Sequence, residues 1–208
     1  LTSGPIYSQL HSLPAMNASG TVGFRATLDS GGFGLFTGNG TTTTTIALTS
    51  GPVWSGFGDT VSINAAGKLA FRGFPDGTAS DGLFISDGTT TTEVIRGGAA
   101  LFGSHLTNYR IGRESFNDAG QLTFWFGLAD GRAGIALATP PAAPAQYTFT
   151  NVADTSSPIY SNFGGSFPSV NAAGTLGFRA QLDAGGQGLF TGDGTTTTTI
   201  ALTSSPTY

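Results

Sequence analysis

The chain lacks cysteine altogether and is poor in charge. None of its 208 residues is cysteine, which excludes disulfides, thiolate catalysis and cysteine-based zinc sites. Charged residues make up 10% of the chain and leave a net charge of -4, without a basic cluster. Because such a chain has nothing with which to neutralise phosphates, we expect no nucleic acid as a partner.

Long apolar runs and histidines are scarce as well. No apolar stretch approaches the ~20 residues of a membrane-spanning helix, so we expect no membrane span in this chain. The two histidines, His11 and His105, occupy non-equivalent places and form no recognisable metal or Ser-His-Asp pattern. No loop carries the closely spaced oxygen ligands of a calcium site. We therefore predict no metal, no cofactor, no catalytic residue and no enzymatic activity.

Glycine, in contrast, is abundant. The chain has 33 glycines, about twice the usual share. They interrupt every long segment, and each would cost about 1 kcal/mol in a helix interior. Threonine, valine, phenylalanine and isoleucine prevail between them, and these residues favour strands. The composition therefore predicts an all-β protein.

A phrase that ends in an aromatic residue recurs along the chain, as LTSGPIY, LTSGPVW, RGGAALF, DTSSPIY and LTSSPTY. Its aromatic residues are Tyr7, Trp54, Phe102, Tyr160 and Tyr208. The recurrence predicts repeats at residues 1–47, 48–95, 96–153 and 154–201. They form one repeat domain, 1–208, in which 202–208 begin a fifth linker. We expect the aromatic residues to pack between adjacent sheets; the alternative is a ring of platforms that stack on sugars.

Each repeat also carries the motif Asn-x-x-Gly-x-x-x-Phe. Its copies are Asn17, Gly20 and Phe24; Asn64, Gly67 and Phe71; Asn117, Gly120 and Phe124; and Asn171, Gly174 and Phe178. Because Asn and Gly tolerate left-handed conformations, the motif predicts a hairpin turn that leads into a strand. In that strand the phenylalanine and the apolar residue two positions before it share one face, which we place in the core.

Two more strands follow in each repeat, joined in three repeats by a second turn of the Asn-Gly or Asp-Gly type. The last strand is rich in threonine, and one apolar residue in each copy is predicted to be buried: Ile46, Val94, Val152 and Ile200. A lone sheet of this size must stack on a neighbour. The sequence thus predicts four four-stranded antiparallel sheets, most simply as a four-bladed β-propeller. An open array of β-sheet repeats and a β-solenoid are the alternatives.

Arginines follow the motif phenylalanine in three repeats and suggest recurring ion pairs. We expect Arg25, Arg72 and Arg179 to pair with Asp29, Asp76 and Asp183. The third repeat departs from the pattern with an extra stretch, GSHLTNYRIGRES, and with a proline-rich segment. Pro140, Pro141 and Pro144 cannot donate to a ladder, so this segment is predicted to be a loop.

With its motif in all four repeats, the chain resembles the bacterial tandem-repeat proteins named for Asn-x-x-Gly-x-x-x-Phe, which carry interchangeable C-terminal surface anchors. The resemblance implies export to a cell surface or extracellular matrix and supplies no catalytic residues. The chain begins with Leu1, and Met16 is its one methionine. We therefore expect the chain to be a processed or trimmed piece, for example a protein from which a secretory leader has been cleaved.

The threonine runs and the fifth linker point to self-association. The runs put almost no charge on an outer strand, and their predicted assembly edge is Thr41, Thr43, Thr45, Thr195, Thr197 and Thr199. A closed ring of four repeats needs only four linkers, whereas the chain carries five. The fifth linker could occupy the matching place in another molecule. Our leading prediction is a non-enzymatic exported structural protein that assembles into a fibre or matrix layer. The alternative is a carbohydrate-binding propeller at the cell surface, with polysaccharide as partner.

Overall fold

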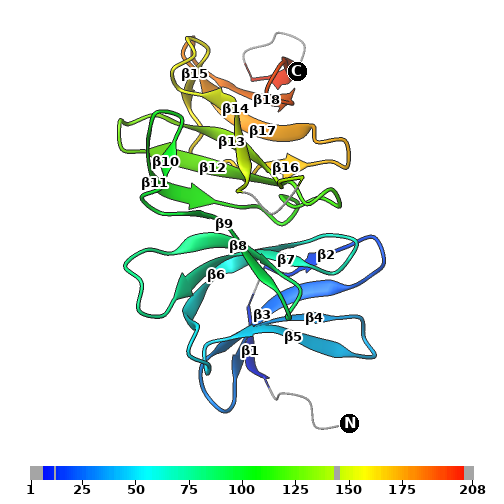
Figure 1. Ribbon diagram of the computed structural model, residues 1–208. Helices are drawn as coiled ribbons and strands as arrows, with labels where there is room; N and C mark the ends of the chain where they lie inside the picture. The colour runs from blue at the N-terminus through cyan, green and yellow to red at the C-terminus, as the bar shows by residue number, and fades with distance from the viewer. Residues whose placement is uncertain (1–6, 12, 143–145, 204–208) are drawn as a thin grey trace. The chain divides into compact units, whose positions relative to one another are not determined.

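The computed structural model describes residues 7–11, 13–142 and 146–203, and within them it contains strands and no helix (Figure 1). In that part of the chain, accordingly, no helix has the length and hydropathy that crossing a membrane requires. The chain divides into two compact units, Leu1–Arg96 and Gly97–Tyr208, and each unit holds two sheets. Tyr208 and Pro144 lie outside the described residues.

The first unit holds the first and second sheets, coloured from blue to green in Figure 1. The first has the order β1-β3-β4-β5, with β2 also paired to β3. Its strands are β1 (Tyr7–Leu10), β2 (Ala15–Met16), β3 (Val22–Leu28), β4 (Phe33–Gly38) and β5 (Thr43–Leu48). The second, in the order β6-β7-β8-β9, consists of β6 (Trp54–Ile63), β7 (Leu69–Pro75), β8 (Gly82–Ser86) and β9 (Thr91–Arg96).

The second unit repeats this plan. The third sheet, β10-β11-β12-β13-β14, is built from β10 (Ala100–Leu101), β11 (Ser104–Arg110), β12 (Leu122–Leu128), β13 (Ala133–Thr139) and β14 (Thr148–Asp154). The fourth has the order β15-β17-β18-β19, with β16 also paired to β17. Its strands are β15 (Tyr160–Asn162), β16 (Ser169–Val170), β17 (Leu176–Leu182), β18 (Gln187–Gly192) and β19 (Thr197–Leu202).

The predicted all-β architecture of four antiparallel repeat sheets is confirmed. Three of the sheets have five strands rather than four, because a short strand, β2, β10 or β16, is added. The pairing of the last two strands shifts register at the same place in every sheet, directly after Leu35, Leu83, Ile135 and Leu189. The extra stretch of the third repeat supplies strand β11, and Pro140 and Pro141 follow the end of β13, outside any strand, as predicted.

The motif glycines form the predicted turns. Gly20, Gly67, Gly120 and Gly174 have φ angles of 82°, 78°, 79° and 82°, a region that residues with a Cβ rarely adopt. In each turn the glycine N–H donates to the carbonyl of the motif asparagine, at 3.0 Å in the first repeat. The next strand therefore begins at an equivalent place in each sheet.

Each unit has a core between its two sheets. We call the side of a sheet that carries the motif phenylalanine its motif face and the other side its back face. In the first unit, Leu35, Ile46 and Ala47 on the back face of the first sheet pack on the motif face of the second. That motif face contributes Trp54, Phe57, Leu69, Phe71 and Phe84.

The second unit follows the same rule. Ile135, Val152 and Ala153 on the back face of the third sheet pack on the motif face of the fourth. The residues contributed by the fourth sheet include Tyr160, Phe163, Leu176, Phe178 and Phe190. One core prediction is wrong: Ile200, expected to be buried like Ile46 and Val152, is exposed, because it lies on the back face of the fourth sheet, which is uncovered.

Candidate functional site

The aromatic linker residues enter the cores in the second and fourth repeats. Trp54 lies 4.8 Å from Phe84 between ring centroids at an interplanar angle of 81°, and Tyr160 lies 5.2 Å from Phe190 at 86°. These edge-to-face contacts are the favourable geometry for aromatic pairs. Because Trp54 and Tyr160 are buried, neither presents a ring face to a ligand. Tyr7, which lies 5.1 Å from Phe36, is half-buried.

Phe102 differs from the other described linker aromatics. It is half-buried, and with φ at 48° it is the one non-glycine residue of the described chain with a positive φ. Its ring contacts Phe126 at 5.2 Å. Phe102 lies in the turn between β10 and β11, and Leu106, paired with Leu128, holds the place that Tyr7 has in the first sheet. Such backbone strain costs about 1–3 kcal/mol and concentrates at functional sites.

The motif asparagines join neighbouring sheets. Asn17 Nδ2 donates to the carbonyl of Asn64 at 3.0 Å, and Asn117 Nδ2 donates to the carbonyl of Asn171 at 2.9 Å. Asn17, Asn64 and Asn117 are buried, whereas Asn171 is exposed. Since these side chains serve the turns and the junctions between sheets, their placement is structural.

The predicted ion pairs have other partners. Arg25 pairs with Asp59 of the second sheet, and Arg72 pairs with Asp81. Arg179 has no acidic partner among the described residues; it donates to Gln187 Oε1 at 3.1 Å and to the carbonyl of Gly164 at 3.1 Å. The pairing with Asp29, Asp76 and Asp183 is wrong. Those residues follow the end of the motif strand, whereas the arginines lie near its middle and meet other partners there.

The threonine runs lie at sheet edges, and the histidines lie apart from each other. Strands β5 and β19 are outermost in their sheets and carry Thr43, Thr45, Thr197 and Thr199, whereas Thr41 and Thr195 lie in the turns before them. All six predicted assembly-edge residues are exposed. His11 contacts Thr27 Oγ1 at 3.2 Å, and His105 lies on β11. Across the described ranges, no three histidine, aspartate or glutamate side chains come together as a metal site would require.

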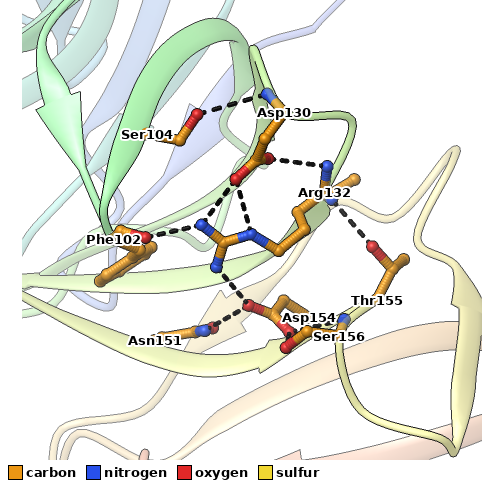
Figure 2. Close-up of polar contacts among 9 residues, drawn as sticks. Phe102, Ser104, Asp130, Arg132, Asn151, Asp154, Thr155 and Ser156 are labelled. Carbon is orange, nitrogen blue, oxygen red and sulfur yellow. Dashed lines mark hydrogen bonds and ion pairs between the residues drawn. The ribbon is translucent and has the colours of Figure 1, made fainter.

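A polar cluster distinguishes the third repeat. It consists of Phe102, Ser104, Asp130, Arg132, Asn151, Asp154, Thr155 and Ser156, brought together by the loop after β10, the β12–β13 turn and the end of β14 (Figure 2). Three of its members replace uncharged residues of the first repeat: Arg132 stands for Gly32, Asn151 for Thr45 and Asp154 for Leu48. The sequence reasoning missed this cluster, and alignment of the repeats position by position would have found it.

Arg132 is at the centre of the polar cluster. Its Nη2 lies 2.8 Å from Asp130 Oδ2 and donates to the carbonyl of Phe102 at 2.6 Å. Its Nη1 lies 3.5 Å from Asp154 Oδ2. The guanidinium thus bridges two carboxylates and the strained linker residue, as Figure 2 shows.

Asp154 is buried but remains ionised. Burial opposes its charge, yet hydrogen bonds from Ser156 Oγ at 2.5 Å and Asn151 Nδ2 at 2.6 Å, together with Arg132, outweigh burial. The pKa of Asp154 is therefore lower than that of a free aspartate. Asn151 Oδ1 is buried and has no hydrogen-bond partner in the described structure.

Asp130 is the partly exposed carboxylate of the cluster. Hydrogen bonds from the Arg132 side chain and main chain lower its pKa. The cluster therefore offers the carboxylate of Asp130 as an acceptor, a guanidinium and hydroxyls as donors, and the half-buried ring of Phe102. Asp154 is buried and its oxygens accept from Asn151 and Ser156, so it positions Arg132 and does not face a ligand. Groups of these kinds, side by side, are suited to binding a polyhydroxylated ligand.

No family model and no curated protein sequence matches this chain. Among solved structures it is similar to the Trypanosoma rangeli sialidase, with a TM-score of 0.52 and 15% identity over 94% of this chain. The same enzyme in complex with 2,3-difluorosialic acid matches over 95%, again at 0.52. A mutant of the Aleuria aurantia lectin in complex with α-methyl-L-fucoside matches over 91% of this chain and 60% of its own, with a TM-score of 0.46 and 11% identity.

The likeness to the sialidase places the chain among all-β repeat folds of the propeller type. The chain spans 38% of the sialidase's length. One prediction is corrected by this finding: the exclusion of enzymatic activity is contradicted, because an enzyme is built on the fold that this chain shares. The absence of a recognisable catalytic motif in the sequence was not sufficient ground for that exclusion. Function depends on how residues are arranged in a three-dimensional site, and such residues need not form a sequence motif.

Proposed function

We propose that the chain is a carbohydrate-binding domain of the propeller type and that the polar cluster of the third repeat is its binding site. The observation that carries this proposal is Arg132, held between Asp130 and Asp154 beside the half-buried ring of Phe102. The fold supports the same ligand class, because the similar sialidase was solved with a sugar derivative, 2,3-difluorosialic acid.

The charges of the cluster select neutral sugars. Two ionised carboxylates and one guanidinium leave an excess negative charge, which repels acidic sugars. Sugar hydroxyls donate to Asp130, and the guanidinium and Ser104 donate to hydroxyl oxygens. The ring of Phe102 provides an apolar surface for the C–H face of a pyranose. We therefore expect neutral glycans to bind more tightly than sialylated ones.

The cluster does not fit the kind of glycoside hydrolysis that uses a pair of carboxyl groups. Hydrolysis by a carboxyl pair needs one group with a raised pKa that can act as an acid. The pKa values of Asp130 and Asp154 are both lowered, so both groups are ionised at neutral pH. The resemblance to surface repeat proteins makes an extracellular polysaccharide the expected partner, and fibre assembly stays a prediction.

The first prediction tests this site with one substitution. The full chain is screened on an array of neutral, fucosylated and sialylated glycans, and each hit is measured by isothermal titration calorimetry. Asp130→Asn should weaken binding of a neutral glycan about tenfold, since one charge-assisted hydrogen bond is lost.

The matched control is Asp29→Asn, an exposed carboxylate at the end of β3 in the first repeat, which should leave the affinity unchanged. Circular dichroism verifies that both variants are folded. A chain that binds no glycan, or that loses equal affinity in both variants, contradicts the proposal.

A further inference from the structure

The back face of the fourth sheet is uncovered. Leu189 is 51% exposed and Ile200 is 56% exposed. Their counterparts on the first sheet, Leu35 and Ile46, are 0% and 7% exposed because the second sheet covers them. The counterparts on the third sheet, Ile135 and Val152, are covered by the fourth in the same way and are among the buried residues.

The motif face of the first sheet is uncovered too. Leu10 is 64% exposed and Met16 is 71% exposed. The residues at the same places in the second sheet, Phe57 and Ile63, are 4% and 7% exposed because they pack on the first sheet. The two uncovered faces are therefore the two complementary halves of the junction that occurs once within each unit.

A polar group at the same junction is also without its usual partner. Asn17 and Asn117 each donate from Nδ2 to the carbonyl of the next motif asparagine. Asn171 makes the turn bonds of the motif, accepting from Ala173 N at 3.0 Å, but its Nδ2 has no acceptor in the described part of the chain. A further motif turn would supply the carbonyl that it lacks.

A hollow in the fourth sheet marks where a side chain would fit. In the first sheet, a Cβ on Gly23 would come within 2.5 Å of Leu69 Cδ2, because that leucine packs directly over the glycine. At the equivalent Gly177 the nearest atom is Ser169 Oγ of the same sheet, at 3.2 Å. A hollow of about 460 Å³ opens there, lined by Gly177 and Leu189 among others. In the first sheet, Val22 occupies the place of Leu69.

We propose that the back face of the fourth sheet binds the motif face of the first sheet in a second copy of this chain. Val22 of the second copy then fills the hollow over Gly177, and Asn171 Nδ2 donates to the carbonyl of Asn17. The contact repeats the junction already present in both units and buries apolar side chains that are otherwise exposed. Because it joins two different surfaces, it extends head to tail into oligomers.

Sedimentation velocity of the full chain over a range of concentrations tests the contact. We expect dimers and larger species that increase with concentration. Leu189→Asp should weaken the association at least about tenfold, from the loss of one buried leucine. Ile159→Asp is the matched control, because Ile159 is equally apolar and 52% exposed but precedes β15 and lies outside the contact. A chain that stays monomeric, or equal weakening by both variants, overturns the proposal.

Disulfide trapping identifies the occupant. The chain has no cysteine, so Asn171→Cys in one copy and Ala18→Cys in another each introduce a single thiol. Asn17 Nδ2 also lies 3.4 Å from the carbonyl of Ala65, and Ala18 holds the equivalent place in the first motif. A mixture of the two variants should form a cross-linked dimer, whereas neither variant alone should. In a chain that carries both substitutions, an intrachain disulfide would show that the chain's own first sheet fills the place, and this overturns the proposal.

Discussion

At the scale of the single residue, each motif asparagine has two functions in the fold. Its Oδ1 accepts main-chain hydrogen bonds of its own turn, as from Thr21 N to Asn17 at 2.9 Å. Its Nδ2 reaches the next sheet where a next sheet is present. The first function follows from local sequence, and the second requires a neighbour in space. Asn17 and Asn171 therefore share a turn and differ in the junction.

The second prediction uses this difference. Asn17→Ala should lower the free energy of unfolding about 1 kcal/mol more than Asn171→Ala, because Asn17 loses an additional buried hydrogen bond to the second sheet. Urea unfolding, at concentrations where the chain is monomeric, measures both variants. Equal losses would mean that the hydrogen bond between sheets contributes nothing measurable.

At the scale of the element, a single glycine in β3 lets a leucine of the second sheet pack directly on the first sheet. Leu69 of the second sheet lies directly over Gly23 of β3, and this contact sets the distance between the two sheets. Gly177 has the same place in β17 but nothing from another sheet lies over it. The same residue type thus has a packing role in one strand and none in the other.

The third prediction compares these two glycines. Gly23→Ala should destabilise the chain by about 1–3 kcal/mol, because the added methyl group overlaps Leu69 and forces the sheets apart. Gly177→Ala should change stability by less than about 0.5 kcal/mol. Thermal unfolding followed by circular dichroism compares the two substitutions. A Gly23→Ala variant as stable as the parent would show that the sheets can move apart at no cost.

The ion pairs also belong to the scale of the element. The alternation of β3 places Arg25 on the back face, and that face packs on the second sheet. Its partner therefore comes from β6, as Asp59, and not from Asp29, which is only four positions away in sequence. The sequence of one strand does not show which residues of the covering sheet will lie against it, so the partner of Arg25 could not be predicted from the motif strand alone.

At the scale of the whole molecule, several carboxyl groups couple stability to pH. Main-chain hydrogen bonds from Thr90 and Thr89 lower the pKa of Asp87 to about 2. The pKa values of Asp130, Asp154 and Asp193 are lowered as well. A carboxyl group with a lower pKa in the folded state stabilises the fold above its unfolded pKa of about 3.9 and loses that contribution as the pH falls.

The fourth prediction follows from this sign. The free energy of unfolding should fall slightly as the pH drops below about 6.5, because burial lowers the pKa of His11. It should fall further from near pH 4 toward about pH 2, the pKa of Asp87. Asp154→Asn should be less stable at neutral pH and should show a shallower fall. Urea unfolding at a series of pH values measures both. The carboxyl groups titrate between about pH 5 and about pH 2. A parent chain whose free energy of unfolding is unchanged over this range would contradict the prediction.

The sequence by itself determined the repeat, the all-β composition, the turn at each motif and the alternation of apolar residues along each strand. These properties depend on the backbone preferences of single residues and on spacing over a few residues, and both can be read from the sequence. The four sheets and the left-handed conformation of Gly20, Gly67, Gly120 and Gly174 follow directly from them.

Only the tertiary structure decided which faces are covered, which acid each arginine meets and where polar side chains gather. Ile46 and Ile200 stand in equivalent threonine-rich strands, yet one is buried and the other exposed. Arg132 comes from the β12–β13 turn, whereas Asn151 and Asp154 come from β14, and they meet only when β13 and β14 pair. The physical reason is that burial and electrostatic pairing depend on neighbours in space, and an identical local sequence has different neighbours in different sheets.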